Sequence, residues 1–144
     1  MILFKQFENI DYNLYQKLDK FILNNFDNSR LYTYEYIIYF TNDNDNDNDN
    51  NNDNEEIIGF IGLQMIKFNI IINQLCVDIN HRNKGIACKM LDYIEELFDS
   101  FNLYLYIHKL EDMKLYNFYI KRGFNQIYKD NVKIKMMKEL KKKF

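Results

Sequence analysis

The chain has 144 residues and a net charge of −2 at pH 7, which suits one domain with one hydrophobic core. No apolar run approaches the roughly 18–20 residues of a membrane span, and the first residues lack the features of a signal peptide. Cys76 and Cys88 form neither a disulfide framework nor a zinc pattern, so we expect two reduced thiols. These exclusions predict a cytoplasmic protein without a membrane partner or a metal.

Charge is unevenly distributed along the chain. Residues 42–54 form a low-complexity run of Asn and Asp that holds five of the 21 acidic residues. The other 16 acidic residues face 19 Lys and Arg, so the rest of the chain is mildly basic. Such a body suits a small polyanionic ligand, but its bases are too scattered to indicate nucleic acid. We expect residues 42–54 to form a disordered loop between two strands, without the spacing of a calcium loop.

Hydrophobic periodicity predicts the elements in chain order. The predicted strands are residues 1–7, 31–40, 57–68, 70–79, 103–107, 124–128 and 132–137, and the predicted helices follow Asp11, Gly85 and residue 110. Asp11 is the expected N-cap of the first helix, which should end near Asn24 and Asn25. In the second helix, Ile86, Met90, Ile94 and Leu97 are expected to face the core. Gly123 is expected to end the third helix.

This order, β-α-β-β-β-α-β-α-β-β, predicts the fold class. It indicates an α/β domain over residues 1–144 with a mixed, mostly antiparallel central sheet flanked by helices.

The junction between strand 70–79 and the next helix has an unusual composition. The chain has only four Gly, three Arg and one Ala, yet Arg82, Gly85 and Ala87 lie within six residues. The first turn of a helix has unpaired N–H groups and partial positive charge, so it attracts anions, and phosphate above all. Small residues let a pyrophosphate approach the backbone. An ordinary helix start is the alternative, but Arg-x-x-Gly-x-Ala between a strand and a helix favours an anion site.

Residues 77–91, V-D-I-N-H-R-N-K-G-I-A-C-K-M-L, resemble the coenzyme-binding motif of the GNAT superfamily of N-acetyltransferases, Arg/Gln-x-x-Gly-x-Gly/Ala after a strand. The order of elements resembles that family along nearly the whole chain. The resemblance implies acetyl-CoA as a co-substrate and amides of the turn as the pyrophosphate site. The implied coenzyme-binding residues are Leu75, Cys76, Val77, Arg82, Asn83, Lys84, Gly85, Ile86, Ala87, Cys88 and Asp112. Asp112 stands where members often have Asn.

A second match lies at residues 119–124, where Y-I-K-R-G-F resembles the Tyr-x-x-x-Gly-Phe of the family. The resemblance implies that Tyr119 lies near the sulfur of the coenzyme. A phenol, whose ordinary pKa is near 10, can protonate a departing thiolate whose pKa is near 8.5. The alternative is that Tyr119 belongs to the core.

The general base and the acceptor are left open by the residues. Asp78 and His108 are the base candidates that the resemblance implies, beside Glu35, His81 or a water relay. A small primary amine such as an amino-sugar phosphate is the best guess for the acceptor. A protein N-terminus or lysine, or a non-catalytic acyl-CoA-binding module, is the alternative. The resemblance also implies that the chain can form a homodimer.

Overall fold

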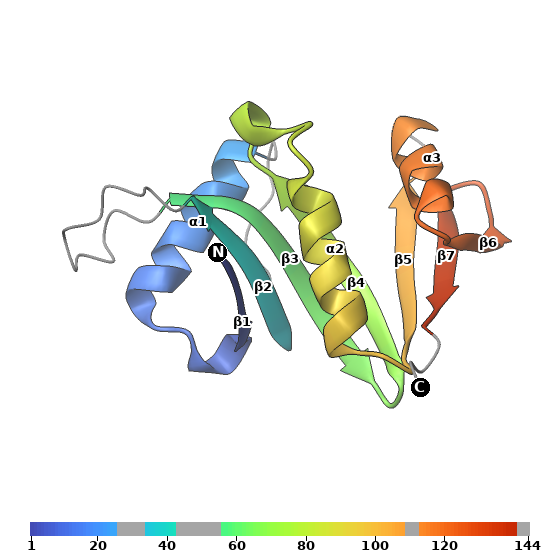
Figure 1. Ribbon diagram of the computed structural model, residues 1–144, viewed down its shortest axis with the longest axis horizontal. Coiled ribbons are helices and arrows are strands. Elements are labelled where there is room, and N and C mark those ends of the chain that lie inside the picture. The colour runs from blue at the N-terminus through green and yellow to red at the C-terminus, as the bar shows by residue number, and fades with distance from the viewer. Residues whose placement is uncertain (26–33, 43–55, 109–112, 141–144) are drawn as a thin grey trace. The chain divides into compact units, whose positions relative to one another are not determined.

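The computed structural model describes residues 1–25, 34–42, 56–108 and 113–140 (Figure 1). Its elements are β1 (Ile2–Gln6), η1 (Phe7–Asn9), α1 (Tyr12–Asn25), β2 (Tyr36–Asn42), β3 (Glu56–Ile66), β4 (Asn69–Val77), η3 (Ile79–His81), α2 (Ile86–Leu97), β5 (Asn102–His108), α3 (Met113–Lys121), β6 (Asn125–Lys129) and β7 (Lys133–Glu139). The predicted order of helices and strands is confirmed. Except for Asn42, which ends β2, the predicted loop at 42–54 lies outside the described residues.

The described strands form a seven-stranded sheet in the order β1-β2-β3-β4-β5-β7-β6. The pairs β1–β2, β2–β3, β5–β7 and β6–β7 are antiparallel, and β4–β5 is parallel. The predicted mixed, mostly antiparallel sheet is therefore confirmed. None of the helices in the described stretches is long and apolar enough to cross a membrane.

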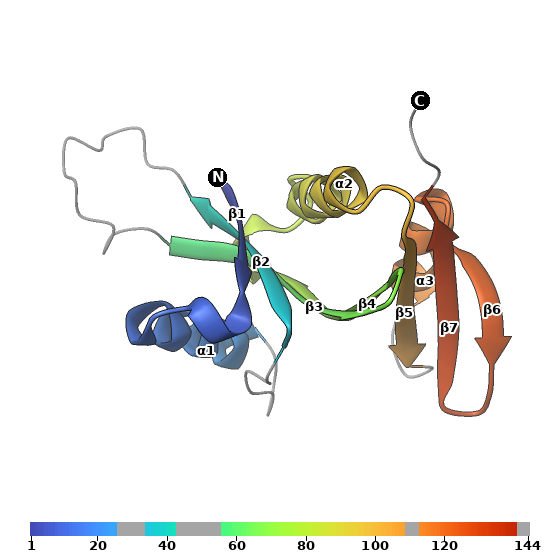
Figure 2. The same ribbon diagram turned by 90° about the horizontal axis from the view of Figure 1, so that it is seen from below.

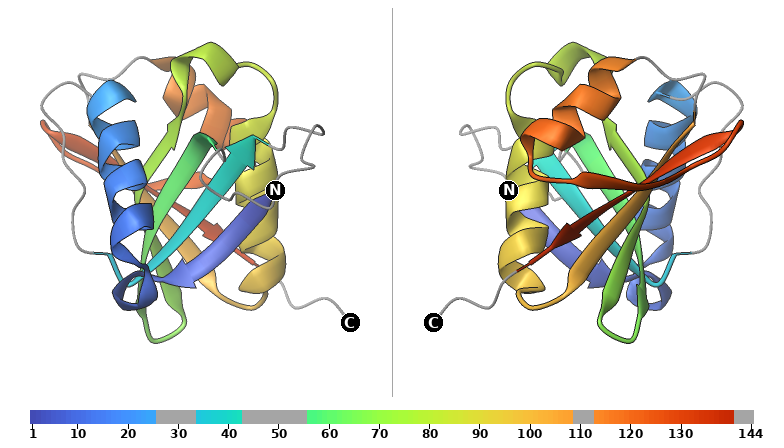
Figure 3. Two further views of the ribbon diagram at one scale, coloured as in Figure 1. Left: turned by 90° about the vertical axis from the view of Figure 1, so that its left-hand side faces the viewer. Right: turned by 90° about the vertical axis from the view of Figure 1, so that its right-hand side faces the viewer.

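The chain divides into two compact units, which are described in turn. The first comprises residues 1–63 and 74–94, and the second comprises residues 64–73 and 95–144. In the first unit, α1 and α2 lie on opposite faces of the sheet formed by β1, β2 and β3 (Figures 2 and 3). Leu18, Phe21 and Ile22 of α1 pack in one cluster with Ile37, Tyr39, Phe60 and Cys76.

Both ends of α1 agree with the sequence prediction. The Asp11 carboxylate accepts a hydrogen bond from the Leu14 N–H at 2.7 Å, which satisfies one of the orphan donors of the first turn. The helix ends at Asn25. The side-chain oxygen of Asn25 accepts a hydrogen bond from the Ile79 N–H at 3.1 Å, so the end of α1 is tied to η3.

The alternation expected in residues 31–40 only partly describes the structure. Residues 31–33 lie outside the described residues, and β2 begins at Tyr36. Ile37, Ile38 and Tyr39 are all buried, because helices cover both faces of this part of the sheet. At these residues β2 therefore lacks the alternation of buried and exposed side chains that a half-buried strand shows.

Gly62 of β3 lies directly beneath the Tyr34 ring. A Cβ at Gly62 would approach three ring atoms at 2.4 to 2.8 Å, and Tyr34 is 6% exposed. A Cβ at Gly59, on the same strand, would meet the flexible end of Met90 at 2.9 Å.

We expect Gly62→Ala to lower the free energy of unfolding by about 1–3 kcal/mol, because the ring must shift in a packed core. Gly59→Ala should cost less, because its closest contact is the flexible end of Met90 and its contact with the Ile86 methyl, at 3.1 Å, is longer than those that Gly62→Ala makes with the Tyr34 ring. Urea unfolding of the two variants checks the order, and an equal loss for both would contradict the packing of Tyr34 described above.

In the second unit, α3 covers one face of the strands β5 and β7 (Figures 2 and 3). The buried side chains of this unit include Leu103, Leu105, Ile107, Ile134 and Met136 from β5 and β7, with Tyr119 and Phe124 from α3 and its end. One predicted core residue is wrong: Leu97 is 43% exposed, and Phe98 is buried instead. Phe98 packs edge-on against Phe101 at 5.6 Å, so Phe98, which follows α2 directly, takes the buried position predicted for Leu97.

Candidate coenzyme and catalytic site

The connection between β4 and α2 begins with a capped turn. The Asp78 carboxylate accepts hydrogen bonds from the Asn80 N–H at 3.2 Å and from Nδ1 of His81 at 2.8 Å. The Asp78 N–H donates to the Ile58 carbonyl at 2.8 Å, which anchors the turn to β3. Asp78 therefore serves as the N-cap of η3.

The hydrogen bond from His81 is the largest cause that lowers the pKa of Asp78, and partial burial opposes it. Because the pKa is lower in the folded protein, this carboxylate stabilises the fold above the ordinary pKa of aspartate. That stability is lost as the pH falls through the lowered value. A carboxylate with a lowered pKa is also a weak base at neutral pH.

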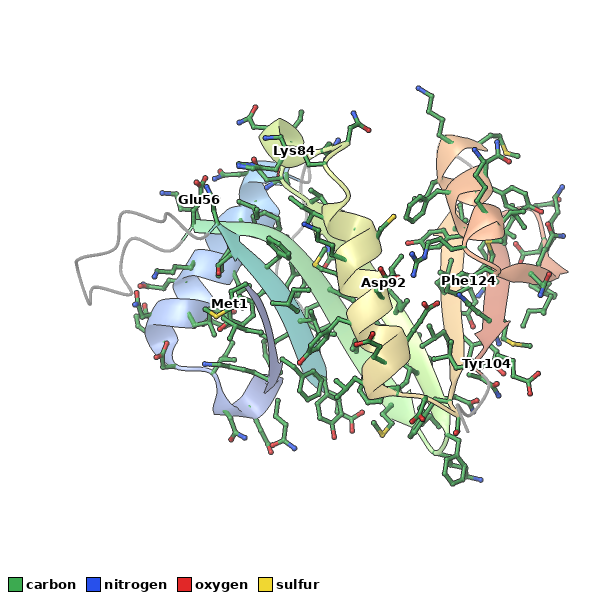
Figure 4. The ribbon with its side chains drawn as sticks, in the orientation of Figure 1. Met1, Glu56, Lys84, Asp92, Tyr104 and Phe124 are labelled. Atoms are coloured by element: carbon green, nitrogen blue, oxygen red, sulfur yellow. The ribbon has the colours of Figure 1, made fainter. Side chains whose placement is uncertain are left out.

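The turn that follows opens onto the start of α2 (Figure 4). Asn83 and Gly85 adopt positive φ values of 64° and 78°, and a Cβ built on Gly85 would meet no atom within 4 Å. The Lys89 N–H donates to the Gly85 carbonyl at 3.0 Å, which is the first bond of the helix. The amides of residues 85–88 precede that bond and form the positive end of a 12-residue helix.

Two cations lie in the same connection. Arg82 and Lys84 are exposed, and Figure 4 shows Lys84 before α2. Nε of Arg82 donates to the Val77 carbonyl at 3.2 Å, so the guanidinium is held over the end of β4. The local geometry thus joins open backbone amides, room beside Gly85 and positive charge, which is what a phosphate site needs.

The end of β4 supplies the other residues of this region. Leu75 and Val77 are half-buried, whereas Cys76 is 3% exposed. Burial raises the pKa of the Cys76 thiol to about 11, an effect that Arg82 only partly offsets. Cys76 is therefore a neutral thiol at pH 7, and its chemistry is that of a packed apolar side chain and not of a nucleophile.

We expect the two thiols to differ in reactivity. Cys88 is half-buried in the first turn of α2, so a thiol reagent should label it in the native protein at pH 8. Cys76 should react only on the timescale of unfolding, because it is both buried and protonated. Mass spectrometry of partly labelled protein checks the order, and early labelling of Cys76 would contradict its burial.

Tyr119 lies in the core of the second unit. It is 4% exposed, and its ring meets those of Phe118 at 5.2 Å and Phe124 at 5.3 Å, both edge-on. Gly123 has a φ of 93° and donates to the Ile120 carbonyl, while the Phe124 N–H donates to the Tyr119 carbonyl. These two bonds form a Schellman motif, so the predicted glycine cap is confirmed and holds Tyr119 rigidly.

Arg122 belongs to an ion-pair cluster that sequence reasoning missed. Its Nη2 donates to Glu95 at 3.1 Å, and Glu95 also pairs with Lys138. Nζ of Lys138 in turn donates to the Arg122 carbonyl at 2.6 Å. The side chain of Glu95 is only 20% exposed. The partners lie 27 and 43 residues away, beyond the reach of local patterns.

The remaining candidate residues are His108, Asp112 and Glu35. His108 is the last residue of β5 and pairs in register with Lys133, while Asp112 lies outside the described residues. Glu35 is exposed at the bend before β2, and Tyr34 and Tyr36 border a cavity of about 410 Å³ there.

The candidate residues are distributed over both units. The first unit brings together the candidates from residues 75–88, and the second unit holds Tyr119 and His108. Within the described stretches, no group of His, Cys, Asp or Glu could hold a metal ion.

Solved structures resemble this fold. The ribosomal-protein-S18-alanine N-acetyltransferase of Escherichia coli is 11% identical, with a TM-score of 0.68 over 100% of this chain and 97% of that one. Naa50 of Arabidopsis thaliana, in complex with a bisubstrate analogue, is 16% identical, with a TM-score of 0.68 over 96% and 99%. The PaiA N-acetyltransferase of Thermoplasma acidophilum, in complex with coenzyme A, is 25% identical, with a TM-score of 0.52 over 58% of this chain. This chain spans 54% of the PaiA chain.

Sequence comparison identifies the family. A search of curated protein sequences finds no match. A family model for the acetyltransferase (GNAT) domain matches residues 47–126, which include the turn at Gly85 and the Tyr119–Phe124 segment. Because that match covers more than half of the chain, and the sheet order and helices agree with those of GNAT structures, the chain belongs to the GNAT family of acetyltransferases.

Proposed function

We propose that this acetyltransferase moves an acetyl group from acetyl-CoA to a primary amine, with the turn at residues 82–88 as the pyrophosphate site. The observation that carries the proposal is the geometry of Gly85. Its positive φ and the empty space beside it allow a phosphate to reach the first-turn amides of α2.

The remaining coenzyme contacts follow from the same connection. Arg82 and Lys84 supply positive charge beside the turn. The backbone of Leu75, Cys76 and Val77 is assigned to the pantetheine arm. This assignment rests on the register of the strands. The parallel pairing of β4 with β5 ends at Ile72↔Leu105, and β4 continues for five residues beyond it, to Val77.

In the reaction, the amine nitrogen forms a bond to the acetyl carbon, the carbon–sulfur bond breaks, and the amine loses a proton. We assign Tyr119 to protonate the departing sulfur, since its ring is held rigidly by Phe118 and Phe124. An amide near Val77 is assigned to the oxyanion. Of the two base candidates, His108 is preferred, because Oδ2 of Asp78 already accepts from Asn80 and His81 in its own turn, and the pKa of Asp78 is lowered.

A peptide amine is the acceptor that we favour. The structures that this chain resembles over nearly their whole length include a ribosomal-protein N-acetyltransferase and Naa50 with a peptide-based bisubstrate analogue. A small amine such as an amino-sugar phosphate is the second candidate, because the chain outside residues 42–54 is mildly basic.

The proposal is tested with the purified protein in two steps. Acetyl-CoA should raise its melting temperature, and no shift at millimolar ligand would refute the coenzyme site. Release of free thiol is then measured with N-terminal peptides, lysine peptides, polyamines and amino-sugar phosphates side by side. A thermal shift without thiol release from any amine would identify a binding module and not an enzyme.

A further inference from the structure

One face of the second unit carries tyrosines and lysines. Side chains alternate along a strand, so the residues between the buried ones on β5 and β7 point away from α3. On β5 these include Tyr104 and Tyr106, and on β7 they include Lys133 and Lys135. Tyr128 on β6 pairs in register with Lys135. We call these five residues the Tyr–Lys face; Figure 4 labels Tyr104 within it.

The ammonium groups of this face lie over the tyrosine rings. Nζ of Lys133 is 4.8 Å from the centre of the Tyr106 ring. Nζ of Lys135 is 5.0 Å from the Tyr104 ring and 5.6 Å from the Tyr106 ring. The negative face of a ring attracts a cation, so the tyrosines hold both ammonium groups on the sheet.

This arrangement concentrates positive charge at an accessible place. Residues two apart on one face of a strand are about 7 Å from each other, so the two lysines repel. Asp130, in the turn before β7, is the acid nearest to Lys133 in sequence, and Glu139, which ends β7 and pairs in register with Asn102, is the acid nearest to Lys135. Oδ1 of Asp130 accepts from the Val132 and Lys133 N–H groups, and its Oδ2 accepts from the Tyr128 hydroxyl. Tyr106 and Tyr128 are 41% and 50% exposed, so a ligand can reach the face.

The chemistry of the face favours carboxylates over nucleic-acid bases. Single-stranded nucleic acid binds by stacking bases on open aromatic faces. Here the faces of Tyr104 and Tyr106 are covered by ammonium groups, which offer hydrogen bonds and charge to an anion. The three strands β5, β7 and β6 together span about 10 Å, which is wide for a monosaccharide. Alternate side chains of an extended peptide have the same spacing as Lys133 and Lys135.

We propose that the Tyr–Lys face selects a peptide acceptor whose first residues after the amine are acidic. This inference rests on the proposed function. Lys133 pairs in register with His108, our preferred base, and Lys135 lies two residues further along β7. An amine near the end of β5 would therefore place the following acidic side chains along the two lysines.

The test compares two peptides that differ only in charge, one with Glu and one with Gln at positions two and three. We expect kcat/KM for the Glu peptide to exceed that for the Gln peptide about tenfold, and raising the salt from about 50 to 500 mM to reduce the ratio. Lys133→Gln with Lys135→Gln should bring the ratio close to one. Lys121→Gln, an exposed lysine at the end of α3, is the matched control and should keep it.

Binding of the same peptides, labelled and N-acetylated, is measured by fluorescence anisotropy without catalysis. If the protein binds the Glu peptide more tightly and the double variant does not, the Tyr–Lys face selects acidic peptides, even if no turnover is seen. Absence of the acetyl-CoA thermal shift refutes only the proposed function. Equal binding of both peptides overturns the inference. Tighter binding of a single-stranded oligonucleotide, or a preference for an amino-sugar phosphate, also overturns it.

Discussion

Ala87→Val and Gly85→Ala are each expected to raise the Kd of acetyl-CoA at least about tenfold while the protein stays folded. Ala87 lies in the first turn of α2 and is half-buried, so valine keeps the helix at a propensity cost of about half a kcal/mol. Its added methyl groups would stand beside the amides that we assign to the pyrophosphate. At Gly85 a methyl group would enter space that no protein atom occupies within 4 Å. Isothermal titration with acetyl-CoA measures both effects.

Gly123→Ala is the matched control for Gly85. Both glycines have positive φ values, 78° and 93°, so alanine costs each about 1–2 kcal/mol of backbone strain. At Gly123 the new Cβ would meet only Lys138 at 3.4 Å, an ordinary contact. All three variants should therefore unfold at lower denaturant concentration, but only those in the turn should lose coenzyme. Equal affinity in Gly85→Ala, Ala87→Val and the unaltered protein would show that the turn is merely a helix start.

Local signals predicted most of the fold. Asp11 and Gly123 act through hydrogen bonds to neighbours within five residues, so their capping roles could be predicted from spacing alone. The turn between β3 and β4 was predicted one residue too late. Lys67 takes the left-handed conformation there, with a φ of 56°, and Phe68 packs edge-on against Phe101. The tertiary contact decided the register, and Phe101 is too distant in sequence for a pattern to include it.

Long-range packing could not be predicted from the sequence. Tyr34 stacks above Gly62, hydrogen-bonds to Gln74 and is 6% exposed, so most of its surface packs in the core although it borders the cavity of about 410 Å³. Arg122 is one of only three Arg in the sequence and adjoins Gly123. The structure accounts for it through its ion pair with Glu95. In both cases the partner is identified only once the chain is folded.

Some features of the candidate site could likewise be predicted from the sequence, and others depend on the folded structure. The sequence placed Gly85 in the turn before α2, because a strand, a turn and a helix start are local patterns, and Gly85 has a positive φ there. The lowered pKa of Asp78 could not be predicted from the sequence, because it depends on the hydrogen bonds that His81 and Asn80 donate to this carboxylate in the folded turn. The burial of Cys76 likewise depends on long-range packing, because it lies in one cluster with α1 and the sheet.

Tyr119→Phe is expected to lower kcat about 10²-fold while the Kd of acetyl-CoA changes little, because the substitution removes only the hydroxyl. The ring contacts with Phe118 and Phe124 would survive, so the core of the second unit should keep its packing. Single-turnover thiol release measures the chemical step, and titration with acetyl-CoA measures binding separately.

Tyr116→Phe is the control on the same helix. The Tyr116 hydroxyl donates to Gln126 at 3.2 Å at an exposed position, so its loss should cost a few tenths of a kcal/mol and leave turnover intact. If Tyr119→Phe and Tyr116→Phe have the same turnover, Tyr119 is a packing residue, and protonation of the sulfur belongs to water or to another group. If turnover falls only in Tyr119→Phe, with no change in melting temperature, lost packing cannot be the cause. The hydroxyl then acts on the reaction itself, which the 4% exposure of Tyr119 could not reveal.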